Sequence, residues 1–395
     1  MYLAAALILL FLFLVAIGFY LWPQNGYRSA YIASQIEKCE SNSTKAQQCL
    51  TKVVVDEAKS HGVDAGFDAL ASAYARDKTF ADTCHGATHT LGDIGYEQYK
   101  KNEQFKLTSK TSYCGFGFFH GFMESLLFDT RDISVARRFC DSAEESMKKT
   151  FSGVSFACYH GIGHGVVDGS DPALWGDAKK YIEPGLKLCD TLGDNEEHKT
   201  RCASGVFNAL GVAYMEPRYL LKPKPNDPYA ICREQDKPYA RKACYDQMNS
   251  YIVPSVGTFK KAISLAAEAE LRYRRTAIWS VAGMSAQKTL SENRDAGVDM
   301  ATCLDLSSEF RDACVDGFAA GLVEFGLPGK EFEIPVAACS HAGQLAQTCY
   351  QEVTASALDR VPIASRTRVC TNIRSVGGDA AGDACLVTIN RSRTP

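Results

Sequence analysis

Five of the eight histidines in this 395-residue chain fall between residues 85 and 164, and each lies four residues from another histidine or from a carboxylate. Imidazole nitrogens and carboxylate oxygens are common protein ligands of zinc, iron, manganese and copper ions. The set comprises His85, His89 and Asp93, then His120 and Glu124, then His160, His164 and Asp168. These residue types and spacings predict a site for divalent transition metals.

Side chains four residues apart lie above one another on one face of an α-helix. The set therefore predicts three polar stripes on three helices, and helices packed side by side would bring the stripes together. Five imidazoles and three carboxylates suffice for two metal ions that keep open positions for water or substrate. We expect the five histidines to bind metal, and Glu124, Asp93 and Asp168 to serve as further ligands or general bases.

Glycines accompany these histidines and provide a second indication. A glycine inside a helix costs about 1 kcal/mol relative to alanine, so five of them near one another need a reason. Close approach of neighbouring helix backbones around a shared centre would supply it. These glycines are Gly86, Gly121, Gly161, Gly163 and Gly165.

Two alternatives compete with a divalent metal site. A single pair of histidines four residues apart is commonly a surface or hydrogen-bonded pair, but three stripes in consecutive repeats favour a metal or catalytic site. Haem held between two opposing histidines is the other alternative. Later repeats carry Ser204, Asn208, Asp316 and Ala320 at the equivalent positions, so we expect those repeats to be structural.

The sixteen cysteines fall into eight neighbouring couples, without a Cys-x-x-Cys motif. An even and regularly spaced set of this size is typical of disulfides formed in an oxidising compartment. Pairing within each couple predicts eight disulfides and a domain outside the cytoplasm; free thiols or thiolate metal ligands are the alternative. The couples are Cys39 and Cys49, Cys84 and Cys114, Cys140 and Cys158, Cys189 and Cys202, Cys232 and Cys244, Cys303 and Cys314, Cys339 and Cys349, and Cys370 and Cys385.

A similar phrase surrounds the second cysteine of most couples and reveals a repeat. From Cys244 through Ile278, Cys314 and Cys349 to Cys385 the steps are 34, 36, 35 and 36 residues. Apolar spacings of three and four, interrupted by loops with proline and glycine, predict one helix–turn–helix unit per repeat. The chain resembles tetratricopeptide arrays in this architecture alone, because their aromatic and proline signature is missing.

The predicted fold is thus all-α, an α-solenoid of helical hairpins stapled by disulfides. We expect residues 25–180 to carry the His and carboxylate cluster, and residues 181–395 to form structural repeats with paired cysteines.

Residues 1–22 form an apolar run without a charged side chain. This length matches the roughly 20 residues that a helix needs to cross a bilayer, and Tyr20 and Trp22 fit an interfacial aromatic belt. We expect a signal-anchor transmembrane helix over residues 1–24, with a cleaved signal peptide as the alternative. The paired cysteines then favour a single-pass membrane protein whose domain lies on the extracytoplasmic side, periplasmic or extracellular.

The net charge of −3 provides no basic surface for nucleic acid. The expected function is therefore that of a membrane-anchored helical-repeat protein with a His/Asp/Glu metal site, and a metal-dependent hydrolytic or oxidative enzyme fits that site. The alternative is a scaffold that binds a protein or peptide partner on the concave face of the solenoid, without catalysis.

Overall fold

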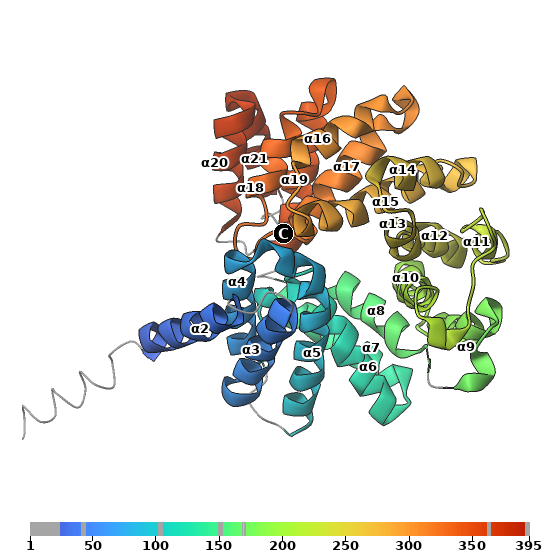
Figure 1. The fold of residues 1–395 in the computed structure, drawn as a ribbon. Coiled ribbons are helices and arrows are strands. Elements are labelled where there is room, and N and C mark those ends of the chain that lie inside the picture. Colours follow the sequence, from blue (N-terminus) through green and yellow to red (C-terminus); the bar gives the residue numbers. More distant parts are fainter. Residues whose placement is uncertain are drawn as a thin grey trace, which may run out of the picture.

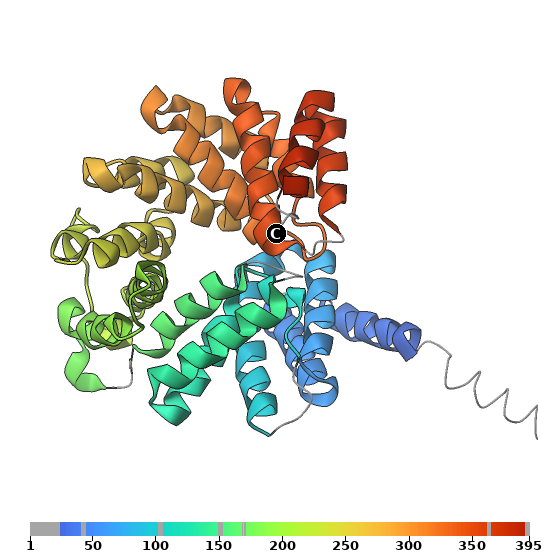
Figure 2. The same cartoon turned by 180° about the vertical axis from the view of Figure 1, so that it is seen from behind.

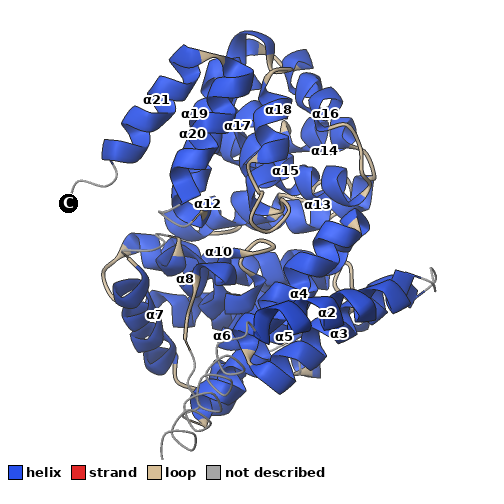
Figure 3. Cartoon of the chain, turned by 90° about the vertical axis from the view of Figure 1, so that its left-hand side faces the viewer, coloured by secondary structure: helices blue, strands red, loops and turns tan. Residues whose placement is uncertain are grey.

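The computed structural model of the chain describes residues 24–40, 45–101, 106–148, 153–167, 169, 171–361 and 365–391. Figure 3 shows helices and short connections, without a β-strand among these residues, so the predicted all-α class is confirmed. The predicted transmembrane helix covers residues 1–24, of which residues 1–23 lie outside the described residues and Gln24 begins the first described helix. Within the described part, no helix combines the length and the apolar character needed to cross a membrane.

The helices follow one another with few residues between them. The first half of the chain contains α2 (Gln24–Glu40), α3 (Ala46–His61), α4 (Val63–Arg76), α5 (Ala81–Lys100), α6 (Gly117–Thr130), α7 (Ile133–Met147), α8 (Val154–Gly165), α9 (Ala178–Asp190) and α10 (Glu196–Ala213). The second half contains α11 (Ala230–Arg233), α12 (Pro238–Gln247), α13 (Asn249–Val256), α14 (Phe259–Ala266), α15 (Leu271–Ser291), α16 (Ala296–Thr302), α17 (Ser308–Glu324), α18 (Glu333–Cys339), α19 (Ala346–Arg360), α20 (Arg366–Gly377) and α21 (Asp379–Arg391). Short 3₁₀ turns in the connections include η2 (Lys78–Phe80), η3 (Ser109–Ser112) and η6 (Cys303–Asp305).

All sixteen cysteines pair, and each disulfide joins the two members of a predicted couple. Seven of these bonds link consecutive helical segments, as Cys39 at the end of α2 and Cys49 in the first turn of α3 do. The Cys84–Cys114 bond differs, because it joins the first turn of α5 to the turn before α6 across a separation of 30 residues. In the chain-entropy model each closed loop stabilises the fold by about 3 kcal/mol.

The hairpins stack so that one helix of each lies on the inside of a curved array. These inner helices contact one another in the order α5, α6, α8, α10, α12, α15, α17 and α19. The array curves until its late helices reach its early ones, as Figures 1 and 2 show from opposite sides. The Tyr74 hydroxyl on α4 donates to the Phe325 carbonyl after α17 at 2.6 Å. The Gln287 side-chain amide on α15 donates to the Ala81 carbonyl of α5 at 3.4 Å. The sequence predicted a solenoid without indicating whether it closes, and the structure shows that the array closes into a ring.

Glycines let the inner helices pack with their backbones in contact. A Cβ atom on Gly121 would lie 2.0 Å from the His89 carbonyl oxygen, and one on Gly161 would lie 2.4 Å from that of Phe119. The predicted close approach is therefore present at these positions. It is absent at Gly86, where a Cβ atom would meet nothing within 4 Å among the residues described. Gly86 borders open space, and helix packing does not explain it.

Candidate metal centre

The inner helices surround one large cavity of about 2370 Å³. The predicted histidines come from three consecutive inner helices, α5, α6 and α8, and all five line this cavity. His120 and His160 are each followed by a glycine that touches the backbone of the neighbouring helix. The glycines after His120 and His160 thus explain how the three helices bring their histidines close together. The convergence that the sequence predicts is present for the histidines.

The first group consists of His85, His89 and His120. The His89 Nε2 atom lies 3.3 Å from His85 Nε2 and 3.0 Å from His120 Nδ1. One ligand nitrogen of each residue lies within 4.8 Å of those of the other two, close enough for all three to share a metal ion. We call this group the α5 triad.

The second group consists of His120, His160 and His164, and its ligand nitrogens also lie within 4.8 Å of one another. The rings of His120 and His164 stack with centroids 4.2 Å apart, and the His160 centroid lies 4.9 Å from that of His120. The His164 Nε2 atom is buried and has no hydrogen-bond partner among the described residues. We call this group the α8 triad. His120 belongs to both triads.

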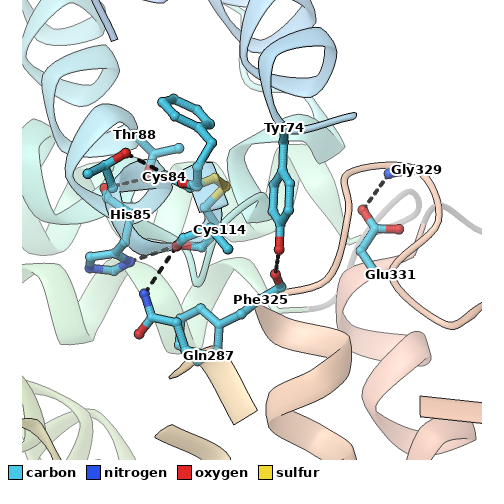
Figure 4. Close-up of a disulfide and its surroundings, with 12 residues drawn as sticks. Tyr74, Cys84, His85, Thr88, Cys114, Gln287, Phe325, Gly329 and Glu331 are labelled. Atoms are coloured by element: carbon cyan, nitrogen blue, oxygen red, sulfur yellow. Dashed lines mark hydrogen bonds between the residues drawn. A yellow bond between two sulfur atoms is a disulfide. The ribbon is translucent and has the colours of Figure 1, made fainter. Parts of the chain in front are cut away.

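An unusual turn orients His85 in the α5 triad. Cys114, Gly115 and Phe116 adopt positive φ angles of 55°, 72° and 62° in succession, and such strain in non-glycine residues persists where the surrounding structure enforces it. The turn aims the Cys114 carbonyl oxygen at His85 Nδ1, 2.7 Å away (Figure 4). A carbonyl only accepts, so Nδ1 carries the hydrogen and the Nε2 lone pair faces the other rings.

A similar hydrogen bond orients His160 in the α8 triad. Its Nδ1 lies 2.7 Å from the hydroxyl oxygen of Ser204 on α10. The same hydroxyl donates its hydrogen to the Arg201 carbonyl at 2.6 Å, so towards His160 it acts as the acceptor. His160 therefore carries its hydrogen on Nδ1 and keeps a lone pair on Nε2. Metal-binding histidines are typically oriented in this way by an acceptor on their other nitrogen.

The electrostatics of the cluster favour neutral imidazoles. Burial is the main cause that lowers the pKa of His85, His89, His120 and His160, and repulsion between the rings lowers it further. Each of these four imidazoles is thus unprotonated at neutral pH and has a lone pair to offer. Neutral imidazole is the form that binds transition metals.

Glu124 lies beside both triads. Its two carboxylate oxygens are 3.9 Å from His89 Nδ1 and 3.6 Å from His164 Nδ1, and its side chain is 44% exposed. The carboxylate thus faces the Nδ1 side of both rings, whereas it is the Nε2 atom of His89 that approaches His85 and His120. A carboxylate in this position can orient the rings and hold a proton near the site.

The other two predicted carboxylates are not found in either triad. Asp93 accepts a hydrogen bond from Ser125 at 2.9 Å and is not one of the described residues that line the cavity. Burial raises the pKa of the Asp93 carboxyl. The four-residue spacing places Asp93 on the correct face of α5, but one turn too far along for the triad. Asp168 lies outside the described residues.

One acidic residue near the α5 triad was not predicted from the sequence. Glu324, at the end of α17, accepts from Arg360 at 3.0 Å and lines the cavity. A Cβ atom on Gly115 would lie 3.3 Å from both Glu324 Oε1 and His85 Nδ1, so the two side chains flank the same turn. Only ring closure brings α17 to α5, and no local sequence pattern signals it.

In comparisons with protein-family models, curated proteins and solved structures, nothing matches this chain. The function is therefore argued from the geometry of the site.

Proposed function

We propose that this chain is an extracytoplasmic metalloprotein whose two triads, which have His120 in common, hold one or two divalent transition metal ions. The observation that carries the proposal is the orientation of His85 and His160, each of which carries its hydrogen on Nδ1 and keeps a lone pair on Nε2. The Nε2 atom of His85 lies 3.3 Å from that of His89. Lone pairs that converge in a buried site are unfavourable unless a donated hydrogen or a cation satisfies them, and the His164 Nε2 atom has no hydrogen-bond partner among the described residues. The chelating geometry of both triads supports the same conclusion.

The cellular location in this proposal rests on the cysteines. Eight disulfides and no free thiol indicate an oxidising environment outside the cytoplasm. The apolar run of residues 1–22 supports attachment to a membrane, with the ring on the extracytoplasmic side.

The site supports catalysis better than a purely structural metal. Three protein ligands per ion leave coordination positions open, which is typical of catalytic zinc sites, whereas structural sites are closed by four. A bound transition metal would supply Lewis acidity and lower the pKa of a coordinated water. Glu124, half-exposed beside His89 and His164, is the candidate general base. Hydrolytic and oxidative reactions both fit this set of ligands, and the identity of the metal decides between them.

A binding scaffold is the second candidate, and the size of the cavity favours it. The volume of about 2370 Å³ exceeds the roughly 300–1,000 Å³ of pockets for drug-sized ligands. Room of this kind suits a peptide segment of a partner protein. In this alternative the histidines serve as packing or as a structural metal clamp.

Elemental analysis of the full-length chain, purified in detergent without chelators, tests the proposal. We expect one or two transition metal ions per chain, and their complete loss in His120→Ala. The matched control is His198→Ala, because His198 also lines the cavity but stacks on Tyr159 outside both triads. Absence of metal after loading with zinc, iron, manganese and copper in turn would refute the metal site and leave the scaffold. An absorption spectrum of the same sample tests for haem.

A further inference from the structure

Next to the α8 triad, the cavity wall continues into an aromatic surface that carries an arginine. Phe156, one turn before His160 on α8, is 37% exposed within the cavity lining. Its ring is nearly parallel to that of His160, with an interplanar angle of 10° and centroids 6.4 Å apart. The Arg201 guanidinium carbon lies 3.9 Å from the centre of the Phe156 ring. The arginine and the ring therefore form one unit beside the metal ligands.

A second arginine and a second aromatic side chain extend this surface towards the place where the late helices meet the early ones. The Phe116 centroid lies 6.4 Å from that of Phe156, and the Arg360 guanidinium carbon lies 5.5 Å from the Phe116 centre. Trp279 on α15 is also 37% exposed in the cavity lining. Large exposed aromatic side chains inside a cavity offer contact area for the apolar part of a ligand.

The hydrogen bonds of Arg201 do not account for its position. Its Nε atom is buried without an acceptor in the part of the chain that the structure describes. Its Nη2 atom approaches Glu197 at 3.5 Å, and one third of the side chain remains exposed. Burial lowers the pKa of the Arg201 guanidinium, which nevertheless stays charged at neutral pH. A partly buried cation with spare donors, facing a cavity, is suited to recognise an anion.

We propose that Arg201 and Phe156 form a recognition subsite for an anionic group, a carboxylate or a phosphate, attached to an aromatic or apolar moiety. The Arg201 guanidinium would hold the anion where its side chain remains exposed to the cavity, and the apolar moiety would pack on Phe156. This inference rests on the proposed function for one point, that the ligand is the substrate of the metal centre. Because Phe156 adjoins His160, a ligand held here would present its neighbouring bonds to the α8 triad.

Two small probes test the subsite, phenyl phosphate and phenylacetate, each combining a ring with one of the two anions. Binding to the full-length chain is measured by calorimetry after metal is removed with a chelator, so that coordination to metal cannot contribute. We expect Arg201→Gln to weaken binding of the preferred probe by at least about tenfold, since a hydrogen bond to a charged group is lost. Arg201→Lys keeps the charge without the planar fork, and we expect it to bind more weakly than the wild type.

Arg218→Gln is the matched control. Arg218 lines the same cavity and lies over an aromatic ring, Tyr219, at 4.7 Å, but its side chain is 66% exposed. We expect this variant to bind both probes as the wild type does. A preference of the wild type for one probe identifies the anion as phosphate or carboxylate.

The inference is overturned if neither probe binds the wild type, if Arg201→Gln binds as tightly, or if Arg218→Gln weakens binding equally. Thermal unfolding of each variant excludes misfolding as the cause. Metal content separates this inference from the proposed function. Arg201→Gln should retain the metal of the wild type. If the wild type takes up no metal under any loading condition but binds the probe through Arg201, the subsite is supported and the metal centre is refuted.

Discussion

The histidine-bearing side of the ring and the side formed by α15, α17 and α19 have the same construction but different chemistry. On the first side, Gly121 touches the His89 carbonyl, and on the second a Cβ atom on Gly317 would lie 2.0 Å from the Trp279 carbonyl. Backbone contact through glycine thus belongs to the ring as a whole. The sequence argument tied these glycines to a shared metal centre, which is too narrow, because the same contact occurs where no histidine is present.

Equivalent positions of the repeat carry the chemical difference. Two residues after the cysteine, or after its replacement Ile278, stand His160 on α8, Ser204 on α10, Ser280 on α15 and Asp316 on α17. At equivalent positions one scaffold therefore presents a histidine of a candidate metal triad, a serine that contacts that histidine, a packing serine and a half-buried acid. This arrangement indicates that the scaffold and the site can be altered separately.

The largest expected effect is the loss of metal from one triad while the other keeps its metal. We expect His85→Ala to abolish metal binding at the α5 triad and His160→Ala to abolish it at the α8 triad, with a loss of affinity above about a hundredfold in each. Removal of an orienting partner alone typically costs 10- to 100-fold, and a ligand contributes more. Metal content per chain after dialysis measures the effect. If either variant loses all metal, the triads bind a single ion together.

Substitution of the contact glycines tests whether both sides of the ring pack alike. We expect Gly121→Ala and Gly317→Ala each to destabilise the fold by about 3 kcal/mol, since the new methyl group would overlap a carbonyl oxygen on the next helix. Gly86→Ala is the control and should be neutral or stabilising by up to about 1 kcal/mol. Midpoints of unfolding in guanidinium chloride provide the comparison. A mild effect at Gly317 alone would mean that the two sides pack differently.

The serine pair tests whether orientation of His160 matters for metal binding. Ser204 and Ser280 are both 3% exposed and occupy the same repeat position, but Ser204 contacts His160 whereas Ser280 donates to the Ala277 carbonyl. We expect Ser204→Ala to weaken metal binding by about 10- to 100-fold and Ser280→Ala to leave it unchanged. Titration against a competing chelator gives both affinities. Equal affinities in the two variants would contradict the orienting role.

Local patterns predicted most of the scaffold and the core of the site. The disulfides followed from the order of the cysteines, because every bond joins neighbouring cysteines and all but Cys84–Cys114 have sequence separations of 10 to 18 residues. The convergence of His85, His89, His120, His160 and His164 followed from two local facts, the four-residue spacing and the equal height of equivalent positions in stacked repeats.

Ring closure could not be predicted in the same way. It depends on small rotations that accumulate over many repeats, and no single motif encodes them. The sequence therefore missed Glu324 and Arg360, which reach the histidine side only across the closure. It also included Asp93, because periodicity defines a face of a helix but does not say where along it the neighbouring helix crosses. The strained turn at Cys114 also depends on contacts with distant parts of the chain, so it could not be predicted from the local sequence.

The smallest expected effect concerns Asp316, the acid at the position that His160 occupies on α8. Burial and the nearby Glu352 carboxylate raise the pKa of Asp316 to about 7, and its Oδ1 has no hydrogen-bond partner among the residues described. Between about pH 4 and pH 7 the folded chain thus keeps a proton that the unfolded chain has released, so stability falls as the pH rises through this window. The partly exposed side chain limits the effect to about 1–2 kcal/mol.

Asp316→Asn should remove this dependence and stabilise the chain above pH 7, while changing little at pH 5. The control is Asp312→Asn on the same helix, because Arg275 lowers the pKa of Asp312 through hydrogen bonds at 2.9 and 2.7 Å. That variant should lose stability at neutral pH instead. Unfolding midpoints at pH 5 and pH 8 measure both. Equal midpoints for Asp316→Asn and the wild type at pH 8 would show that the ionised Asp316 carboxylate is well solvated and would contradict its raised pKa.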